Sequence, residues 1–324
     1  MKLDTIDKKI LTYIYHHYRD SISSIAKECN LSKDQINYRL QKYEKEKIIL
    51  KYVTLYNYNL LGKNNFIIVW ISCKNKDILR KELEKMENIL TYGDMISKWD
   101  IFINFIYSDI NEFKKELNEF LLKYKENIIN HSLFITTSFH LFDLKTFNIK
   151  KKSQSFTVLE EKNNPIRLSE NDIKILKLLE NNGRIKIIDI AKKTNLSSTA
   201  IIKNIKKYKK IGLIQGVRVL LDMEKIGYYW GEIHLKFKYL DEKNTNKIIE
   251  YSKQHPHINL ITFGIGEINC IIQIFFEKIV DLKETVKDIK LKFNELIIST
   301  EIILTENEGN VKTLPFFNNI NNNK

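Results

Sequence analysis

Hydrophobic residues recur at three- and four-residue spacing in two distant regions of the chain, which predicts amphipathic helices there. The apolar positions are Ile6, Ile10, Leu11 and Ile14 near the start, and Ile175, Leu176 and Leu179 near the middle. Each region continues with a pair of shorter helical stretches, and then with a stretch that alternates as strands do, at 48–56 and 213–221. We therefore expect the same order of elements twice.

The third predicted helix of each region has a clear start. Ser32 and Ser197 stand where a hydroxyl can cap that helix. Gln35 follows Ser32 at the spacing of a capping box, and Asp172 stands in the same relation to Ser169 at an earlier helix. Three helices with a tight turn between the last two, followed by a small hairpin, are typical of a winged helix-turn-helix.

The two regions are copies of one unit. With an offset of 165 positions, residues 6–62 align on 171–227 without a gap. The offset becomes 169 further along, where Asp100 falls on Asn269. An internal repeat of this length indicates a duplicated structure.

After the alternating stretch, each copy reads strand, helix, strand, strand, helix, strand. In the first copy the stretches are "FIIVWISC", "DILRKELEKMENI", "LTYGDMIS", "DIFINFIY", "INEFKKELNEFLLKY" and "IINHSLFITTSFHLF". This order is that of a ferredoxin-like domain, whose sheet has one face covered by helices. The other face needs a partner, and we expect the second copy to supply it.

The predicted fold class is therefore α+β, with each winged helix-turn-helix followed by a ferredoxin-like domain. We place the winged units at 1–60 and 167–226, the ferredoxin-like domains at 61–146 and 227–310, a polar linker at 147–166 and a flexible tail at 311–324.

Positive charge is concentrated in the two winged units. The whole chain carries a formal net charge of +13. Residues 1–51 hold eleven Lys and Arg against seven Asp and Glu, and residues 167–218 hold thirteen against four, so these two segments contain the entire excess. A genome-wide lysine bias would spread the charge more evenly, whereas basic helix-turn-helix units fit phosphate binding. Within 197–210 there are five lysines and no acid, which predicts a stronger electrostatic grip by the second unit.

The geometry of a recognition helix suggests which residues contact DNA, since its first turn approaches base edges and its later outward residues approach phosphates. The candidates are Ser32, Lys33, Gln35, Asn37, Tyr38, Arg39 and Lys42 in the first copy, and Ser197, Ser198, Thr199, Lys203, Asn204, Lys206 and Lys207 in the second. The side-chain amides of Gln35 and Asn37 can each form a pair of hydrogen bonds with adenine. The alternative is that these residues form a solvated helix face, and that the two serines only cap.

The chain resembles the Lrp/AsnC class of prokaryotic regulators, also called leucine-responsive or feast/famine regulators. The resemblance is carried by "LDTIDKKIL" and "LSENDIKIL", and by "IAKECNLSKDQINYRLQKYEKEKII" and "IAKKTNLSSTAIIKNIKKYKKIGLI". Gly62 and Gly227 match the glycine that usually ends the wing segment. The resemblance implies duplex DNA binding, transcriptional control and dimerisation through sheet domains of the RAM type. The tandem form is a departure, and makes one chain look like a covalent pseudo-dimer.

The resemblance also implies an amino-acid effector between subunits, near a Thr-Gly-x-Tyr-Asp type loop. Here the corresponding stretches read "SKWD" and "GEIN". Trp99 and Asp100 preserve an aromatic-acid pair, and the carboxylate of Asp100 would suit a ligand's ammonium group. The alternative is that both stretches are ordinary turns between strands.

Other classes find little support. The three cysteines are far apart, and we expect neither a disulfide, a metal site nor a cofactor. No phosphate-binding glycine loop occurs, and we expect no enzyme activity. Sirohaem decarboxylases resemble the same architecture and remain an alternative, with His131, His140 and His234 on predicted strands but in no motif. A further alternative is an oligomerising protein that has lost DNA binding.

No apolar run approaches the roughly 18 residues of a membrane helix, so we expect no membrane partner and a cytoplasmic, nucleoid-associated protein. We also expect homo-oligomers of the pseudo-dimeric chain. His16 and His17 are placed at the exposed end of the first helix.

Overall fold

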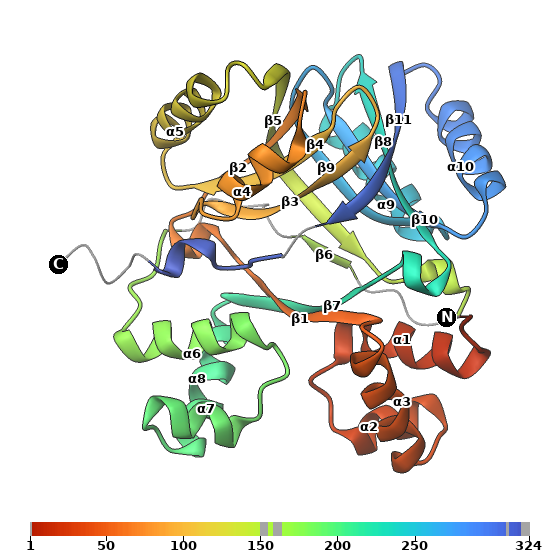
Figure 1. Cartoon of the computed structure of the whole chain (residues 1–324). Helices are drawn as coiled ribbons and strands as arrows, with labels where there is room; N and C mark the ends of the chain where they lie inside the picture. Colours follow the sequence, from red (N-terminus) through yellow and green to blue (C-terminus); the bar gives the residue numbers. More distant parts are fainter. Residues whose placement is uncertain (1, 150–154, 158–163, 309–310, 319–324) are drawn as a thin grey trace.

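Two three-helix units lie on the same side of the molecule, beneath a large β-structure (Figure 1). The computed structural model describes residues 2–149, 155–157, 164–308 and 311–318. The first helical unit consists of α1 (Thr5–His17), α2 (Ile22–Cys29) and α3 (Lys33–Lys45), and the second of α6 (Glu170–Asn181), α7 (Ile187–Thr194) and α8 (Ser198–Lys210). No helix among these residues is long and apolar enough to cross a bilayer.

The caps predicted for these helices are confirmed. Ser32 Oγ accepts a hydrogen bond from the main-chain N–H of Gln35 at 3.1 Å, and Ser197 Oγ accepts one from Ala200 at 3.1 Å. Capping boxes join Ser32 to Gln35 and Ser169 to Asp172. Each satisfies main-chain donors that the first helical turn leaves unpaired.

The two copies share one wing sheet. Strand β1 (Ile49–Tyr56) pairs antiparallel with β7 (Ile214–Leu221), and these two strands form a separate two-stranded sheet. The expectation of a small hairpin within each copy is therefore wrong. After each wing strand the chain enters a short 3₁₀ turn, η1 (Asn59–Leu61) or η3 (Glu224–Ile226), and rises into the large sheet, so the hydrogen-bond partner must come from the other copy.

The β-structure is a closed ring of eight strands. Their bounds are β2 (Asn65–Cys73), β3 (Ile89–Ile96), β4 (Ile101–Tyr107), β5 (Ile128–Phe142), β8 (Tyr229–Phe237), β9 (Ile258–Gly266), β10 (Cys270–Phe276) and β11 (Ile297–Glu308). Each copy has the ferredoxin-like order, β3-β4-β2-β5 or β9-β10-β8-β11. The copies join edge to edge through β3–β11 and β5–β9, which leaves no open edge on the ring.

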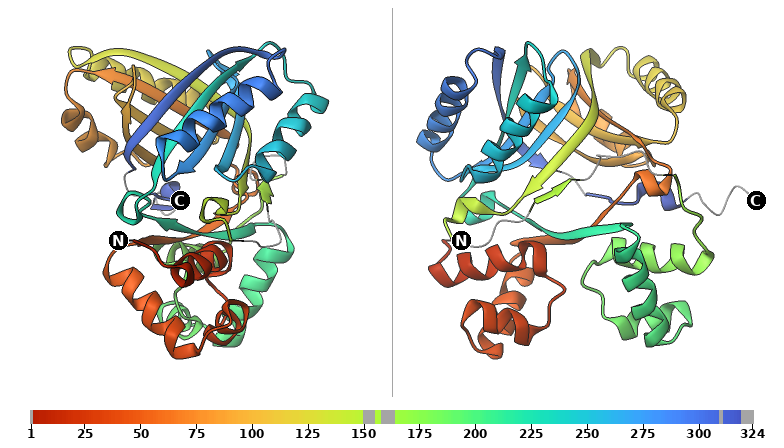
Figure 2. Two further views of the ribbon diagram at one scale, coloured as in Figure 1. Left: turned by 90° about the vertical axis from the view of Figure 1, so that its right-hand side faces the viewer. Right: turned by 180° about the vertical axis from the view of Figure 1, so that it is seen from behind.

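Helices cover the outside of the ring in two layers (Figure 2). They are α4 (Lys76–Leu83), α5 (Ile110–Lys123), α9 (Glu242–Gln254) and α10 (Ile279–Lys292). Each pair forms an apolar core with its own sheet. Inside the ring lies a third core, which includes Trp70, Trp99, Phe102, Phe134 and Ile271.

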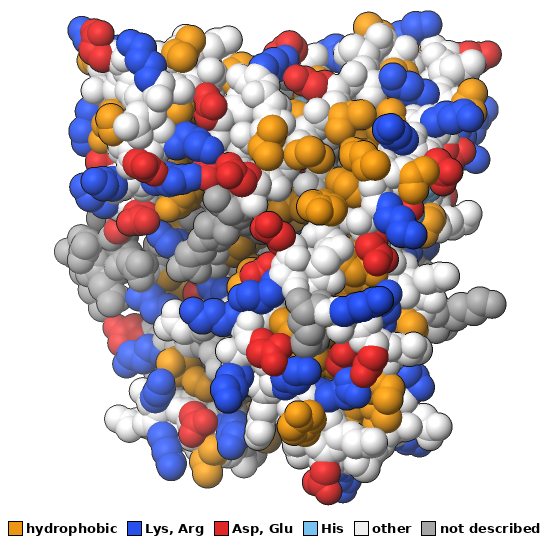
Figure 3. Space-filling model, turned by 45° about the vertical axis from the view of Figure 1, so that its right-hand side comes forward, with side chains coloured by type: hydrophobic (Ala, Val, Ile, Leu, Met, Phe, Trp, Pro, Cys, Tyr) orange, Lys and Arg blue, Asp and Glu red, His pale blue; other side chains and the backbone are white. Residues whose placement is uncertain are grey.

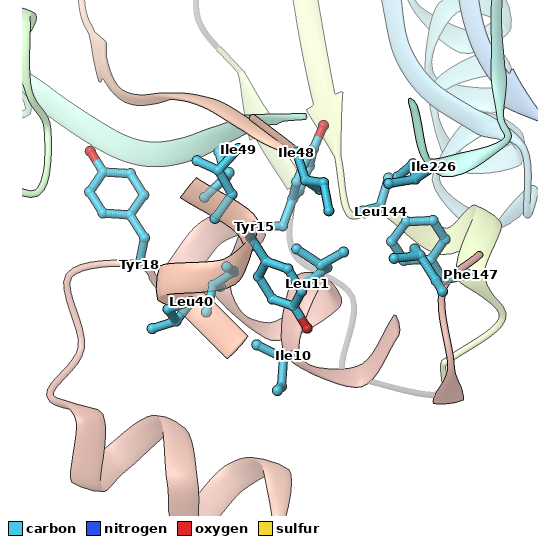
Figure 4. Close-up of a cluster of buried hydrophobic side chains, with 14 of the residues drawn as sticks. Ile10, Leu11, Tyr15, Tyr18, Leu40, Ile48, Ile49, Leu144, Phe147 and Ile226 are labelled. Carbon is cyan, nitrogen blue, oxygen red and sulfur yellow. The ribbon is translucent and has the colours of Figure 1, made fainter. Parts of the chain in front are cut away.

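Each helical unit packs beneath the sheet domain of the other copy. The core of the first helical unit contains Met223, Tyr228 and Phe275 of the second copy. The core of the second helical unit contains Tyr58 and Leu90 of the first copy. Figure 4 shows part of the core of the first helical unit. The α1 residues, Leu144 and Ile226 in this core come from three separate stretches of the chain. The copies are therefore interwoven.

The linker and the tail contribute to the fold, in contrast to their polar sequences. Phe147 of η2 (Lys145–Phe147) is buried under the first helical unit, and β6 (Ser155–Thr157) pairs with β5. At the end of the chain, η4 (Pro315–Asn318) buries Phe316 and Phe317 against the second helical unit. The expectation of a flexible tail at 311–324 is thus wrong for 311–318, because its aromatic side chains fill an apolar core; residues 319–324 lie outside the described residues.

His16 is buried, so its predicted exposed position is wrong. Its side chain is 1 % exposed, and its ring nitrogens lie 2.9 Å from the carbonyl oxygen of Val217 and 3.4 Å from that of Phe142. The carboxylate of Asp143 is 3.9 Å away. Burial lowers the pKa of His16 to about 4. The contacts come from β7 and β5, which are remote in sequence.

Candidate nucleic-acid interface

Helices α3 and α8 occupy the recognition position of the two helix-turn-helix units (Figure 1). The turn before each is made by an asparagine with a left-handed backbone, Asn30 with φ 54° and Asn195 with φ 55°. Asparagine tolerates this conformation better than most side chains. Both helices belong to the helical units beneath the β-ring (Figure 1).

Most of the predicted contact residues of the first unit are exposed. Ser32, Lys33, Gln35, Asn37 and Tyr38 are open to solvent, and Tyr38 retains 68 % of its accessible surface. The Oε1 atom of Gln35 accepts a hydrogen bond from the main-chain N–H of Ser32 at 2.9 Å. Gln35 must therefore break its capping box, or use its amide nitrogen alone, to contact a base.

Arg39 is engaged within the protein. Its guanidinium donates hydrogen bonds to Asp4 at 2.9 and 3.1 Å and forms an ion pair with Asp7. Tyr43 also donates to Asp7, at 2.7 Å. These contacts join α3 to the start of α1, and they give Arg39 a positioning role that the sequence had not indicated. Lys42, one turn further along, is half-buried.

The second unit keeps the same acid-tyrosine contact without the arginine. Tyr208 donates a hydrogen bond to Asp172 at 2.6 Å. Asn204 occupies the position equivalent to Arg39, and a hollow of about 510 Å³ lies here, lined among others by Arg167 and Lys207. A shorter neutral residue thus leaves the surface open where the first unit is closed by an ion pair.

The remaining candidates of the second unit form an open, basic surface. Ser197, Ser198, Thr199, Lys203, Lys206 and Lys207 are all exposed. Positive charges at this density attract phosphates, and each neutralised phosphate releases counterions. The last turn of α8 adds Lys209 and Lys210. The second recognition helix is therefore basic from Lys203 to its end and carries no acid, whereas α3 carries Asp34 in its first turn.

Both residues of the predicted effector pair make contacts within the protein. Trp99 is only 5 % exposed and packs inside the β-ring. The carboxylate of Asp100 accepts a hydrogen bond from the main-chain N–H of Cys73 at 2.8 Å. In the second copy, the Asn269 side chain bonds the main chain of Phe237 in the same way, at 2.8 and 2.9 Å. The two residues therefore fit the alternative of a strand-joining turn, and effector binding at Trp99 and Asp100 stays a prediction.

A cavity of about 950 Å³ lies between wing strand β7 and the lower mouth of the β-ring. Six aromatic residues form part of its wall: Tyr15, Tyr228, Tyr229, Trp230, Phe275 and Phe276. Gln273 also lines it, and neither Gln273 Oε1 nor Trp230 Nε1 has a hydrogen-bond partner among the residues that the structure describes. No sequence pattern indicated this cavity, since its wall combines segments from both copies.

The histidines considered for an enzyme site have separate environments. His131 is exposed, His140 lies 3.1 Å from the hydroxyl of Thr157, and His234 lies 2.8 Å from a carboxylate oxygen of Glu232. No group of three His, Cys, Asp or Glu residues among the described residues is arranged to hold a metal ion.

Comparison with known proteins identifies the helical units. A family model for winged helix-turn-helix DNA-binding matches twice, at residues 3–49 and 168–215. An uncharacterized HTH-type transcriptional regulator of Pyrococcus furiosus is 31% identical over 125 residues, which cover 38% of this chain and 82% of that protein. The leucine-responsive regulatory protein of Rhizobium meliloti is 23% identical over 46% of this chain and 88% of its own length. The chain belongs to the Lrp/AsnC family. It is a DNA-binding transcriptional regulator, and each relative corresponds to about one of its two copies.

One solved structure resembles the chain over its full length. The siroheme decarboxylase NirDL, solved with an iron-uroporphyrin III analogue, covers 97% of this chain and 95% of its own at a TM-score of 0.61. The sequences are 10% identical, so the likeness concerns the fold alone. The tandem arrangement of this Lrp/AsnC-family chain thus has a counterpart among solved structures.

Proposed function

We propose that the chain is a sequence-specific reader of duplex DNA that acts as a covalent pseudo-dimer with two unequal reading heads. The first head is the helix-turn-helix unit that contains α3, and the second is the unit that contains α8. One observation carries this proposal: α3 and α8 belong to the two helical units beneath the β-ring (Figure 1), yet only α8 has several lysines and no acid. In symmetric helix-turn-helix dimers, half-site symmetry mirrors protein symmetry. An asymmetric operator follows from two different heads.

The two heads make different contacts with DNA. The second head holds phosphates through Lys203, Lys206 and Lys207, which supplies affinity that depends little on sequence. The first head reads bases through Asn37, and through Gln35 when its amide turns toward the groove. Ser32, Lys33, Tyr38 and Lys42 flank these readers, as Ser197, Ser198, Thr199 and Asn204 do in the second head.

The test is selection of bound DNA by the full-length protein from a random duplex pool. We expect an enriched motif with two dissimilar half-sites about one helical turn apart, because dimers of this kind place their recognition helices at that spacing. Recovery of a perfect palindrome would contradict the unequal-heads model. Recovery of no motif, with binding that depends on salt alone, would contradict sequence reading.

Regulation by a small effector belongs to this proposal, with amino acids as the first class to test. The cavity beneath β7 is a better place for it than Trp99 and Asp100, because it is open and adjoins the wing. Mouths of β-barrels are common ligand sites. Thermal-shift measurements with each amino acid, repeated with Gln273→Leu, test both the ligand and the place. A shift that survives in that variant would contradict the location.

Assembly into homo-oligomers is also proposed, through the two seams of the β-ring. At the β3–β11 seam Ile96 is 60% exposed, and its equivalent at the β5–β9 seam, Ile265, is 66% exposed. Ile298 and Ile129, near the starts of β11 and β5, are equivalent to each other and are 60% and 65% exposed. Figure 3 shows hydrophobic side chains gathered on the upper part of the face that carries β11. The same apolar positions in both copies suit two equivalent contacts with other chains.

Tetrapyrrole binding is the second candidate function, favoured by the full-length likeness of fold to NirDL. Tetrapyrrole binding would not explain the lysines of α8. Addition of sirohaem to the purified protein tests it directly. A stoichiometric shift of the Soret band, abolished by filling the cavity with Val219→Trp, would support this function, and an unshifted band would exclude it.

A further inference from the structure

Equivalent positions of the two copies meet face to face at three levels of the molecule. The middle level is the wing sheet. Val53 of β1 pairs directly with Arg218 of β7, and these residues are 165 positions apart, the offset of the repeat in this region. A residue can face its own equivalent only on the axis that relates the two copies. The pseudo-twofold axis therefore passes between Val53 and Arg218.

The lower level lies between the helical units. Gly183 is the equivalent of Tyr18, again 165 positions away. The main-chain N–H of Gly183 donates to the carbonyl of Tyr52 at 3.0 Å. A Cβ atom at Gly183 would lie 2.1 Å from the hydroxyl oxygen of Tyr18 and 2.5 Å from the carbonyl oxygen of Tyr52. Tyr18 is fully buried here, so the ring of one copy occupies space that the other leaves empty.

The upper level lies inside the β-ring, where Trp70 and His234 contact each other with ring centroids 4.9 Å apart. Strands β2 and β8 have nine residues each, and both rings stand at the sixth. The pairing confirms their equivalence: Trp70 faces Phe102 on β4, and His234 faces Ile271 on β10, which is the repeat partner of Phe102. Both side chains are 2% exposed.

At every level the facing residues are unlike in size or charge. A tyrosine meets a glycine, a valine meets an arginine, and a tryptophan meets a histidine. Arg218 donates hydrogen bonds to the hydroxyl of Tyr15 at 2.9 Å and to the side-chain oxygen of Asn259 at 2.9 Å, so its charge is satisfied away from the axis. His234 is held by Glu232 at 2.8 Å.

We propose that this axial surface makes the two copies specific for each other, so that each half fits the unlike half and rejects its own kind. Two first halves would bring Tyr18 against Tyr18 and Trp70 against Trp70, in volumes that hold one large ring. Two second halves would place Arg218 opposite Arg218, and like charges directly opposite in a strand pair destabilise it. Specificity of this kind comes from clashes against the wrong partner as well as from fit to the right one.

The consequence is a chain that always presents one copy of each DNA-reading head. A symmetric dimer that exchanged like halves would carry two identical heads. The axial contacts exclude that assembly, and they fix the heads as an unequal pair. The way the halves pair does not depend on which DNA is read.

Full-length variants that exchange the axial residues test the proposal. Gly183→Tyr makes the lower contact alike, and we expect its melting temperature to fall by about 5 °C or more, since overpacking strains a filled core. The double variant Tyr18→Gly with Gly183→Tyr places the same two side chains at the same axial point. We expect it to recover the part of the loss that comes from the Tyr18 ring, while the 2.5 Å approach of the new Cβ atom to the Tyr52 carbonyl oxygen remains. A double variant as unstable as the sum of its two single changes would overturn the proposal at this level.

A second, independent cycle uses the upper contact. His234→Trp crowds the lumen with two tryptophans, and the double exchange with Trp70→His restores one of each. The matched control is Arg39→Asn with Asn204→Arg, an exchange between equivalent positions on α3 and α8 that lie in separate helical units. We expect strong coupling in the axial cycles and additive effects in the control. Equal coupling in all three cycles would show that the axis has no special role.

Discussion

The hydroxyl of Tyr208 donates a hydrogen bond to the carboxylate of Asp172 over 2.6 Å, and both groups are buried between α8 and α6. The equivalent contact in the first copy joins Tyr43 to Asp7 over 2.7 Å. Each contact fixes a recognition helix to the first helix of its unit. The position of α8 against its unit therefore depends on this tyrosine-carboxylate bond, whereas α3 is also held by the contacts of Arg39 with Asp4 and Asp7.

Tyr208→Phe should lower the free energy of unfolding by about 1–3 kcal/mol, because it leaves a buried carboxylate with one acceptor unmet. Chemical denaturation at neutral pH measures the change. Tyr229→Phe is a suitable control, since that residue is 57 % exposed. An equal loss in both variants would contradict a specific role for the bond.

The pH dependence of Tyr208→Phe should also differ from that of the wild type. Burial alone would raise the pKa of Asp172, but the hydrogen bonds from Tyr208 and Ser169 outweigh burial and hold that pKa below its ordinary value of 3.8. A carboxyl with a depressed folded pKa stabilises the protein above its unfolded pKa, and the contribution is lost as pH falls through the folded pKa. The variant should therefore lose less stability than the wild type between pH 5 and 3, as followed by denaturation midpoints.

His16 gives a pH dependence at higher pH. Burial lowers its pKa to about 4, and the nearby Arg218 also disfavours the charged ring, while Asp143 favours it. The unfolded chain binds a proton near pH 6.5 and the folded chain does not, so stability should fall as pH drops from 6.5 toward 4, by up to about 1.4 kcal/mol per pH unit. His16→Gln should flatten this slope. An unchanged slope would assign the effect to other groups.

The repeat, the order of elements and the helix caps were predictable, because each depends on residues close together in the sequence. The capping spacing of Ser32 and Gln35 is an example. The pairing of β1 with β7 was not predictable, since an alternating stretch has the same pattern whichever strand it pairs with. The role of Arg39 depends on Asp4, which lies 35 positions away. The burial of Phe316 was masked by the polar residues that surround it.

Substitutions at the equivalent positions Arg39 and Asn204 should have different effects on stability and on DNA affinity. Arg39→Asn should reduce stability by breaking the contacts with Asp4 and Asp7, with DNA affinity falling mainly through misplacement of α3. Asn204→Arg should raise affinity, because it adds a cation to the open basic surface of the second unit. Denaturation and DNA titration of the two variants separate these effects. Higher salt should reduce the gain from Asn204→Arg.

Removal of three lysines tests the electrostatic role of the second head. The triple variant of Lys203, Lys206 and Lys207 to Ala should bind all duplexes more weakly, and the slope of log affinity against log salt should flatten by about 2–3, since each phosphate contact contributes about 0.9. Lys114, Lys115 and Lys125 are exposed in and after α5, and their replacement by Ala makes a charge-matched control. If both triple variants flatten the slope equally, net charge rather than α8 governs binding.

The seams of the β-ring supply the last prediction. Ile96→Lys and Ile265→Lys together place a charge on each seam, at equivalent positions where the side chains are already mostly exposed. The single-chain fold should be preserved, because neither side chain belongs to a buried core, while association between chains should weaken. Analytical ultracentrifugation across a concentration series measures the change. Leu122→Lys with Leu291→Lys is the matched control, since these equivalent leucines are 70 % and 68 % exposed on the outer helices. Loss of association in the seam variant alone would locate the contact on the ring, whereas loss in both would mean that added charge, and not the seam, keeps the chains apart.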